Sequence, residues 1–241
     1  MPNPLFNFFS EQRKTTESAF LNNQLPCPKK YPSALRTPLA VPEKSQLTLS
    51  DLLAKRKSQR DFSGHGLAMD DLSFLLYWST AEDVALVQDE SGTFRRRPYP
   101  SGGAKFPIET YIVTDEHTEL GTAAYHYRPD IHELEHVADL TTERVQEIKK
   151  TYGYTFVASA PVLILFTYIR ERNLPKYGLF GEKLALIEAG HIAQNMYLCA
   201  TERDVSVVSL GGGGAELADV CLQLDSYNES VFYTLAAGKP N

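Results

Sequence analysis

The spacing of apolar residues along the chain predicts four helices. Leucines at positions 72, 75 and 76 follow the i, i+3, i+4 spacing of a helix face, and two aspartates precede them, so we expect a helix over 70–79. Shorter helices are predicted over 48–55, with Ser50 as a candidate N-cap, and over 141–152. The longest helix is predicted over 182–203. Its expected apolar face consists of Leu184, Ile187, Ile192, Met196 and Cys199.

Runs of β-branched and aromatic residues predict the strands. These runs cover residues 108–114, 122–127, 161–168, 205–210 and 231–237. The turn at 115–121 should join the first two strands into a hairpin, and the continuous apolar run at 161–168 is typical of a buried central strand. Residues 81–99 are polar and predict an irregular segment. The order of elements indicates an α+β fold, with helices covering a central sheet and without the βαβ repeat of dinucleotide-binding folds.

The first 47 residues differ from the rest and predict an N-terminal arm ahead of one domain over 48–241. Phe6, Phe8 and Phe9 form an aromatic cluster that favours burial, so we expect the arm to pack against another surface. Prolines break any long helix in this segment. They are Pro2, Pro4, Pro26, Pro28, Pro32, Pro38 and Pro42.

Charge and composition narrow the classes of function. The formal net charge of −6 argues against non-specific nucleic-acid binding, which needs a basic surface. No apolar run approaches the roughly 18 residues of a membrane span. The three cysteines (Cys27, Cys199, Cys221) are far apart and the six histidines are scattered, which predicts neither disulfides nor a metal site. We therefore expect a cytoplasmic protein that binds neither membrane nor nucleic acid.

Arg56, Lys57 and Ser58 form a compact candidate phosphate site directly after a predicted helix. Two cations neutralise phosphate charge, and a hydroxyl donates a hydrogen bond to a phosphate oxygen. A charge run at a helix end is more often a solvated surface. Lys239, near the end of the chain, is either a tail residue or a third cation for the same phosphate.

Three further stretches combine backbone freedom with polar groups. Residues 100–103 (Pro-Ser-Gly-Gly) permit close approach to a flat ligand, although a tight turn into a strand is commoner. The glycine run 211–214 is equally consistent with a flexible loop and with a backbone lining over a planar cofactor. Lys176 and Tyr177 can act as base and acid if a site shifts their pKa values, although such a pair usually lies in a surface loop.

Several stretches in fixed order carry a family resemblance. They are KRKSQRDF at 55–62, LAMDDLSFLLYWST at 67–80, RRRPYPSGGAKFPIETYIV at 95–113, LGTAAYHYRPDIHEL at 120–134, KYG at 176–178, EAGHIAQNMYLCA at 188–200 and LAAGKP at 235–240. Together they resemble the nitroreductase superfamily of flavoproteins. They are most similar to its SagB-type branch, the azoline dehydrogenases of thiazole/oxazole-modified peptide biosynthesis.

The resemblance implies a three-layer fold with a mixed, mainly antiparallel sheet, an intertwined homodimer and FMN at the dimer interface. It assigns the FMN phosphate and ribityl chain to Arg56, Lys57 and Ser58, the flavin N1/O2 edge to Arg60, and completion of the phosphate site to Lys239. The family usually has Arg-Arg-Ser at the first motif, so Lys57 is a departure that keeps the charge. The flavin face and the N5 edge would be lined by Pro100, Ser101, Gly102, Gly103, Leu210, Gly211 and Gly212.

The resemblance also implies a reaction, in which Lys176 and Tyr177 remove a proton while the flavin accepts a hydride from an azoline ring. The substrate would be a peptide or a carrier-bound relative. We see no leader-peptide-recognition domain, so partners in a modifying complex are expected for a peptide substrate. Two alternatives stay open, an NAD(P)H-dependent nitroreductase or quinone reductase and a non-catalytic flavin-binding subunit.

Overall fold

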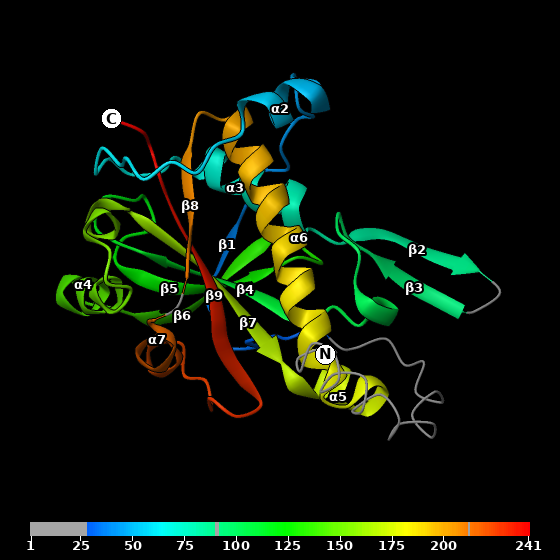
Figure 1. The fold of residues 1–241 in the computed structure, drawn as a ribbon. Helices are drawn as coiled ribbons and strands as arrows, with labels where there is room; N and C mark the ends of the chain where they lie inside the picture. Colours follow the sequence, from blue (N-terminus) through cyan, green and yellow to red (C-terminus); the bar gives the residue numbers. More distant parts are fainter. Residues whose placement is uncertain (1–27, 90–91, 212) are drawn as a thin grey trace, which may run out of the picture.

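A seven-stranded sheet forms the centre of the protein in the computed structural model, which describes residues 28–89, 92–211 and 213–241 (Figure 1). The strand order is β1-β6-β5-β4-β7-β9-β8, and each neighbouring pair is antiparallel. β4 and β7 lie in the middle, so both faces of 161–168 are covered, as its apolar run predicted. The strands are β1 (Arg36–Pro38), β4 (Ile108–Thr114), β5 (Ala123–Arg128), β6 (Glu133–Asp139), β7 (Val162–Ile169), β8 (Ser206–Leu210) and β9 (Glu229–Gly238).

Helices cover both faces of this sheet and create two apolar cores. α3 (Met69–Thr80) and α6 (Phe180–Glu202) pack on one face, and α4 (Thr142–Thr151) and α7 (Ala215–Cys221) pack on the other (Figure 1). The short helices α2 (Leu49–Lys55) and α5 (Arg170–Tyr177) contact α6. The expected three-layer α+β fold is confirmed.

The structure corrects several local predictions. Residues 81–99 contain a separate hairpin of β2 (Asp83–Asp89) and β3 (Gly92–Arg96), which extends away from the sheet in Figure 1, where we expected an irregular segment. Thr48, rather than Ser50, caps α2, because its hydroxyl accepts from the Asp51 amide while the Asp51 carboxylate accepts from the Thr48 amide. The sequence also left β1, β6, α5 and α7 unpredicted, because their apolar residues do not repeat with a clear helical or strand period.

The apolar face of α6 differs from the predicted stripe at Ile187, whose side chain is 47% exposed. The helix instead buries the small side chains of Ala185, Ala189 and Ala193 against the sheet, and Leu186 is exposed beside Ile187. Small residues allow the helix axis to lie close to the strands, and this leaves larger apolar side chains on its outer face.

The described part of the N-terminal arm, residues 28–47, packs against the domain. β1 extends the sheet beyond β6, the Trp78 indole donates to the Glu43 carbonyl, and Glu202 accepts hydrogen bonds from the Gln46 amide and the Ser45 hydroxyl. Phe6, Phe8, Phe9 and Cys27 lie outside the described residues.

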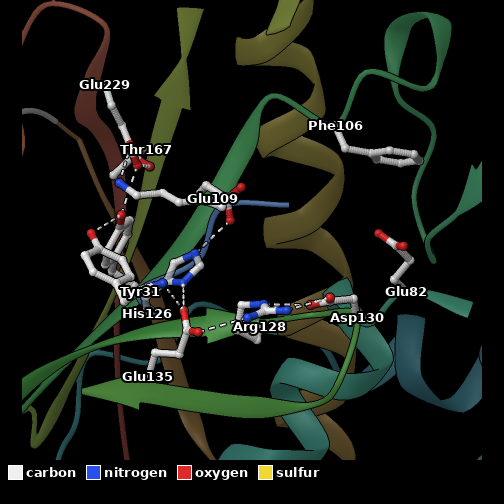
Figure 2. Close-up of polar contacts among 12 residues, drawn as sticks. Tyr31, Glu82, Phe106, Glu109, His126, Arg128, Asp130, Glu135, Thr167 and Glu229 are labelled. Atoms are coloured by element: carbon white, nitrogen blue, oxygen red, sulfur yellow. Dashed lines mark hydrogen bonds and ion pairs between the residues drawn. The ribbon is translucent and has the colours of Figure 1, made fainter. Parts of the chain in front are cut away.

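A line of buried charges crosses the sheet from β4 to β6 (Figure 2). His126 lies between two carboxylates, with Nε2 2.9 Å from Glu109 Oε2 and Nδ1 3.0 Å from Glu135 Oε2. Burial disfavours the charged imidazole, but the hydrogen bonds to both carboxylates outweigh that cost and raise the pKa of His126. At the two ends, Arg172 pairs with Glu109 and Arg128 pairs with Glu135. His126 thus provides a hydrogen-bond partner for each of two buried carboxylates, Glu109 and Glu135.

Replacing His126 by alanine should lower the free energy of unfolding by about 3–5 kcal/mol at pH 6, because it removes the group that bridges two buried carboxylates and leaves each with one buried oxygen unpaired. Folding raises the pKa of His126, so its full contribution to the stability of the folded protein is present at pH values below the pKa it has in the unfolded chain. This contribution is lost as pH rises through the pKa that it has in the folded protein. The measurement is urea unfolding at pH 6 and at higher pH. The exposed His65, replaced by alanine, is the control and should change stability by less than about 0.5 kcal/mol. A loss at His126 no larger than this control would contradict the assigned role.

Candidate active site

The loop that contains Gly103 meets the end of α5 in space. A Cβ atom built on Gly103 would lie 2.5 Å from the Tyr177 hydroxyl oxygen and 2.8 Å from Lys176 Nζ. Two stretches that are far apart in the sequence, each expected to contribute to a flavin site, therefore lie against one another. The positive φ of Gly103 disfavours a residue with a Cβ, and a side chain here would also make both polar groups shift.

Lys176 and Tyr177 lie in the last turn of α5, not in the surface loop that was the commoner expectation. A tight elbow joins α5 to α6, in which Asn173 Nδ2 donates to the Gly181 carbonyl at 3.1 Å. Arg172, one turn before Lys176, forms an ion pair with Glu109 at 2.5 Å. The helix that carries the candidate base is thereby attached to the sheet.

The loop from Ser101 to Phe106 has an unusual backbone that side chains hold in place. Gly103, Ala104 and Phe106 have φ values of 62°, 52° and 45°, a region that residues with a Cβ rarely adopt. The Ser101 hydroxyl accepts from the Phe106 amide at 2.8 Å and donates to Glu188 Oε2 at 2.6 Å. At the other end, Arg172 Nη1 donates to the Phe106 carbonyl at 2.7 Å.

Two charged residues of this region were not predicted as site residues. Burial raises the pKa of Glu188 to about 7, although the hydrogen bond from Ser101 and the charges of Arg97 and Arg172 oppose the rise. Burial, and then the charge of Lys176, lower the pKa of Lys105. One signal was available for Glu188, which stands four residues after Leu184 and four before Ile192, within an apolar stripe.

Tyr177 and a cavity next to Pro100 are the other features of this region. Burial raises the pKa of Tyr177, which keeps its hydroxyl protonated and able to donate. Pro100 is exposed at the rim of a cavity of about 760 Å³. The other lining residues are Tyr77, Trp78, Ala81, Glu82, Arg96, Arg97, Pro98 and Tyr99.

The candidate phosphate site lies near the other half of α6. The Arg56 guanidinium lies 5.5 Å from the centre of the Tyr197 ring, and the Ser58 hydroxyl donates to the Tyr197 oxygen at 3.4 Å. Tyr197 in turn bonds the Ser209 hydroxyl on β8, directly before Leu210. These contacts bring the Arg56–Ser58 stretch next to the end of β8.

The remaining predicted cations differ in their surroundings. Lys57 and Arg60 are exposed. Lys239 instead forms an ion pair with Asp71 at 2.8 Å, and its amino group donates to the Arg203 carbonyl. In this arrangement Lys239 neutralises an acidic residue of α3, so its role toward a phosphate stays a prediction.

The glycine run after β8 divides into two parts. Gly213 and Gly214 have φ values of 84° and 79°, and a Cβ on either would overlap the end of α4 at Thr151 and Tyr152. Their role is therefore close packing. Leu210 is buried and a Cβ on Gly211 would meet open space, whereas Gly212 lies outside the described residues.

The predicted residues thus form two groups along α6, rather than one. Ser101, Gly103 and Lys176 gather near Glu188, and Arg56 and Ser58 gather near Tyr197. Nine residues separate Glu188 from Tyr197, which is about 14 Å along a helix axis.

Metal sites, disulfides and membrane-spanning helices are all absent from the described residues. Its histidines, cysteines and acidic residues form no group of three or more that is arranged to hold a metal ion. Cys199 and Cys221 are buried free thiols. Over the same residues, no helix combines the length and the apolar character of a membrane span.

Three proteins are similar to this chain in sequence. "Putative nitroreductase MJ1384" of Methanocaldococcus jannaschii is 29% identical over 72% of this chain and 83% of its own length. The Microcin B17-processing protein McbC of Escherichia coli is 34% identical over 44% of this chain, and the Trifolitoxin-processing protein TfxB of Rhizobium leguminosarum bv. trifolii is 25% identical over 68%. The matches span 41% of McbC and 45% of TfxB, less than half of each.

Solved structures share the fold. In the E. coli microcin synthetase McbBCD complex with truncated pro-MccB17 bound, one chain superposes with a TM-score of 0.68 and 25% identity, over 83% of this chain and 75% of that chain. A nitroreductase-like protein from Desulfovibrio desulfuricans in complex with FMN has a TM-score of 0.53 and 19% identity, over 81% of this chain and 88% of that chain. The model of the Nitroreductase family matches residues 53–239, so this chain belongs to the Nitroreductase family.

Proposed function

We propose that this protein is an FMN-dependent oxidoreductase that dehydrogenates azoline rings in a peptide or carrier-bound substrate. The observation that carries the proposal is the contact of Lys176 and Tyr177 with Gly103, which places a candidate base and acid against the loop expected to line the flavin. A simple reductase needs no dedicated base. A dehydrogenase that removes a proton and a hydride from one ring does need a base.

The residues present fit FMN. Arg56, Lys57 and Ser58 supply two cations and a hydroxyl for one phosphate, the donor set that phosphate oxygens prefer. Gly103 leaves a side-chain-free surface beside Lys176, and Glu188 Oε1 is a buried oxygen for which the described residues provide no hydrogen-bond partner. Bound flavin would supply hydride acceptance, and the protein would supply binding and orientation.

A homodimer would reconcile the two groups along α6, by placing the phosphate site of one protomer beside the loop site of its partner. Support comes from the outer face of α6, where Leu186 and Ile187 are exposed and a Cβ on Gly190 would meet open space. Packing within one protomer gives no reason for a helix-interior glycine at this position, whereas close approach of a second helix would.

Proton removal is assigned to the Lys176 amine, with the Tyr177 hydroxyl as its hydrogen-bonding partner. A base must be neutral before it accepts a proton, and a second cation nearby favours the neutral form of an amine. Burial, and then the charge of Lys176, lower the pKa of Lys105 and so favour its neutral form. Lys105 is therefore the alternative base.

The peptide substrate is proposed from the relatives. The names of McbC and TfxB describe processing of microcin B17 and trifolitoxin, and the solved McbBCD complex contains a truncated pro-MccB17. By analogy, this chain would act with partner proteins. The match to MJ1384 over 83% of that relative's length favours the second candidate, an NAD(P)H-dependent nitroreductase or quinone reductase.

The purified protein should be yellow or become yellow with added FMN, because the chain offers a phosphate site and a glycine-lined loop. Absorbance after gel filtration measures the bound flavin. Arg56→Ala should weaken FMN binding by about tenfold or more, because one charge-assisted contact to phosphate is lost. Arg36→Ala, an exposed arginine on β1, is the matched control. A protein that stays colourless at excess FMN would refute the cofactor.

Lys176→Ala should lower kcat for oxidation of a thiazoline-containing peptide by about 100-fold or more, with FMN still bound, because the base is lost. Lys105→Ala should have a smaller effect, since Lys105 is the alternative base. The reverse result would make Lys105 the base. Near wild-type turnover in both variants, together with faster NADH oxidation by a nitroaromatic acceptor, would favour the second candidate.

Gly103→Ala should impair catalysis as much as loss of the base, because the new Cβ would displace Lys176 Nζ and the Tyr177 hydroxyl. Gly121→Ala is the matched control, since Gly121 has a similar φ of 68° but no atom near the added Cβ. Steady-state kcat and thermal unfolding are measured for both variants. If Gly103→Ala and Gly121→Ala lose the same amount of stability and have the same kcat, the contact of Gly103 with Lys176 and Tyr177 has no catalytic importance.

A further inference from the structure

Glu188 is a buried acidic residue with no assigned role, and it touches the loop at the site. Its side chain projects from α6, is 2% exposed and accepts the Ser101 hydroxyl at 2.6 Å. Within the described residues, its second oxygen, Oε1, has no hydrogen-bond partner. An isolated buried carboxyl is costly to keep ionised, so its retention calls for a reason.

The loop that Glu188 holds has little intrinsic preference for its observed shape. Positive φ values at Ala104 and Phe106 each raise the energy of the backbone, and such conformations persist only where the surroundings fix them. Ser101 bridges the two ends of this loop, because its oxygen also accepts the Phe106 amide. Fixing the Ser101 hydroxyl therefore fixes the turn that contains Gly103.

We propose that Glu188 is a positioning residue, which anchors the Ser101–Phe106 loop through the Ser101 hydroxyl and so places Gly103 against Lys176 and Tyr177. It acts through Ser101 and takes no proton from the substrate. The inference about the loop concerns the protein alone. Only the experiment that uses bound flavin as a probe of the loop depends on the proposed function.

The anchor should depend on pH in the physiological range. Burial raises the pKa of Glu188 to about 7, against the opposing effects of Ser101, Arg97 and Arg172, and Tyr99 is the other titratable group that interacts with it. The hydrogen bond from Ser101 lowers the pKa of Glu188, which means that the hydroxyl binds the ionised carboxylate more strongly than the protonated acid. The anchor should therefore be strongest above pH 7 and weakest near pH 5.

Hydrogen–deuterium exchange of the protein without flavin tests the anchor directly. After correction for intrinsic exchange rates, protection of the Phe106 amide should rise about tenfold between pH 5 and pH 8 in the wild type, as Glu188 ionises. Glu188→Gln keeps the size and an acceptor but does not titrate, so its protection should be constant over this range. Ser101→Ala should lower protection about tenfold at pH 8, where Glu188 is ionised, because the bridging hydroxyl is lost.

Glu182→Gln is the matched control, because it removes one negative charge from an exposed position on the same helix. It should retain the wild-type pH dependence. If Glu188→Gln also retains that dependence, or if Ser101→Ala leaves the protection unchanged, the anchor is refuted. Thermal unfolding of each variant shows whether a loss of protection is local to the loop or global.

The flavin gives a second, independent readout. With saturating FMN, the visible circular dichroism of the bound flavin should change between pH 5 and pH 8 in the wild type. It should stay constant in Glu188→Gln. A protein that fails to bind FMN would refute the proposed function while the exchange result still decides on the anchor. A bound flavin whose spectrum changes equally in both proteins would refute the anchor and leave the proposed function standing.

Discussion

The ion pair between Arg172 and Glu109 is the interaction on which the candidate site depends. It joins α5, which carries Lys176, to β4 in the middle of the sheet, and the same guanidinium donates to the Phe106 carbonyl at the end of the strained loop. A planar group with several donors suits this task, because it can bond a carboxylate and a carbonyl at fixed angles. Movement of Arg172 would shift the base and the loop together.

The sheet beneath this ion pair contains charges that an apolar core would avoid. Glu109, His126, Glu135 and Arg128 alternate in sign across three strands, so each buried charge has an opposite neighbour. Such chains add little net stability compared with apolar packing, but breaking one link is costly. The arrangement therefore tolerates few alternative registers of β4, β5 and β6, and this restricts where Arg172 can attach.

Local sequence patterns predicted the elements that have a clear apolar run or stripe and missed those that lack one. The strands at 108–114 and 162–169 and the helix α3 follow from apolar spacing, because each has one dominant environment. β6 has the composition of a surface segment, although its Glu135 is buried and joins the charged network. The prediction for α6 was wrong at Ile187, which is exposed, whereas Ile192 and Met196 are fully buried as predicted and alanines complete the buried face.

The sequence by itself determined the fold class, two cations and a hydroxyl as a candidate phosphate site, and the presence of a Lys-Tyr pair and a separate glycine-containing stretch. Only the tertiary structure decided that Lys176 and Tyr177 meet Gly103, that Lys239 pairs with Asp71, and that Glu188 and Lys105 have shifted pKa values. The reason is physical. Residue type and local spacing set what a segment can form, whereas distances, burial and pKa values depend on atoms from distant segments.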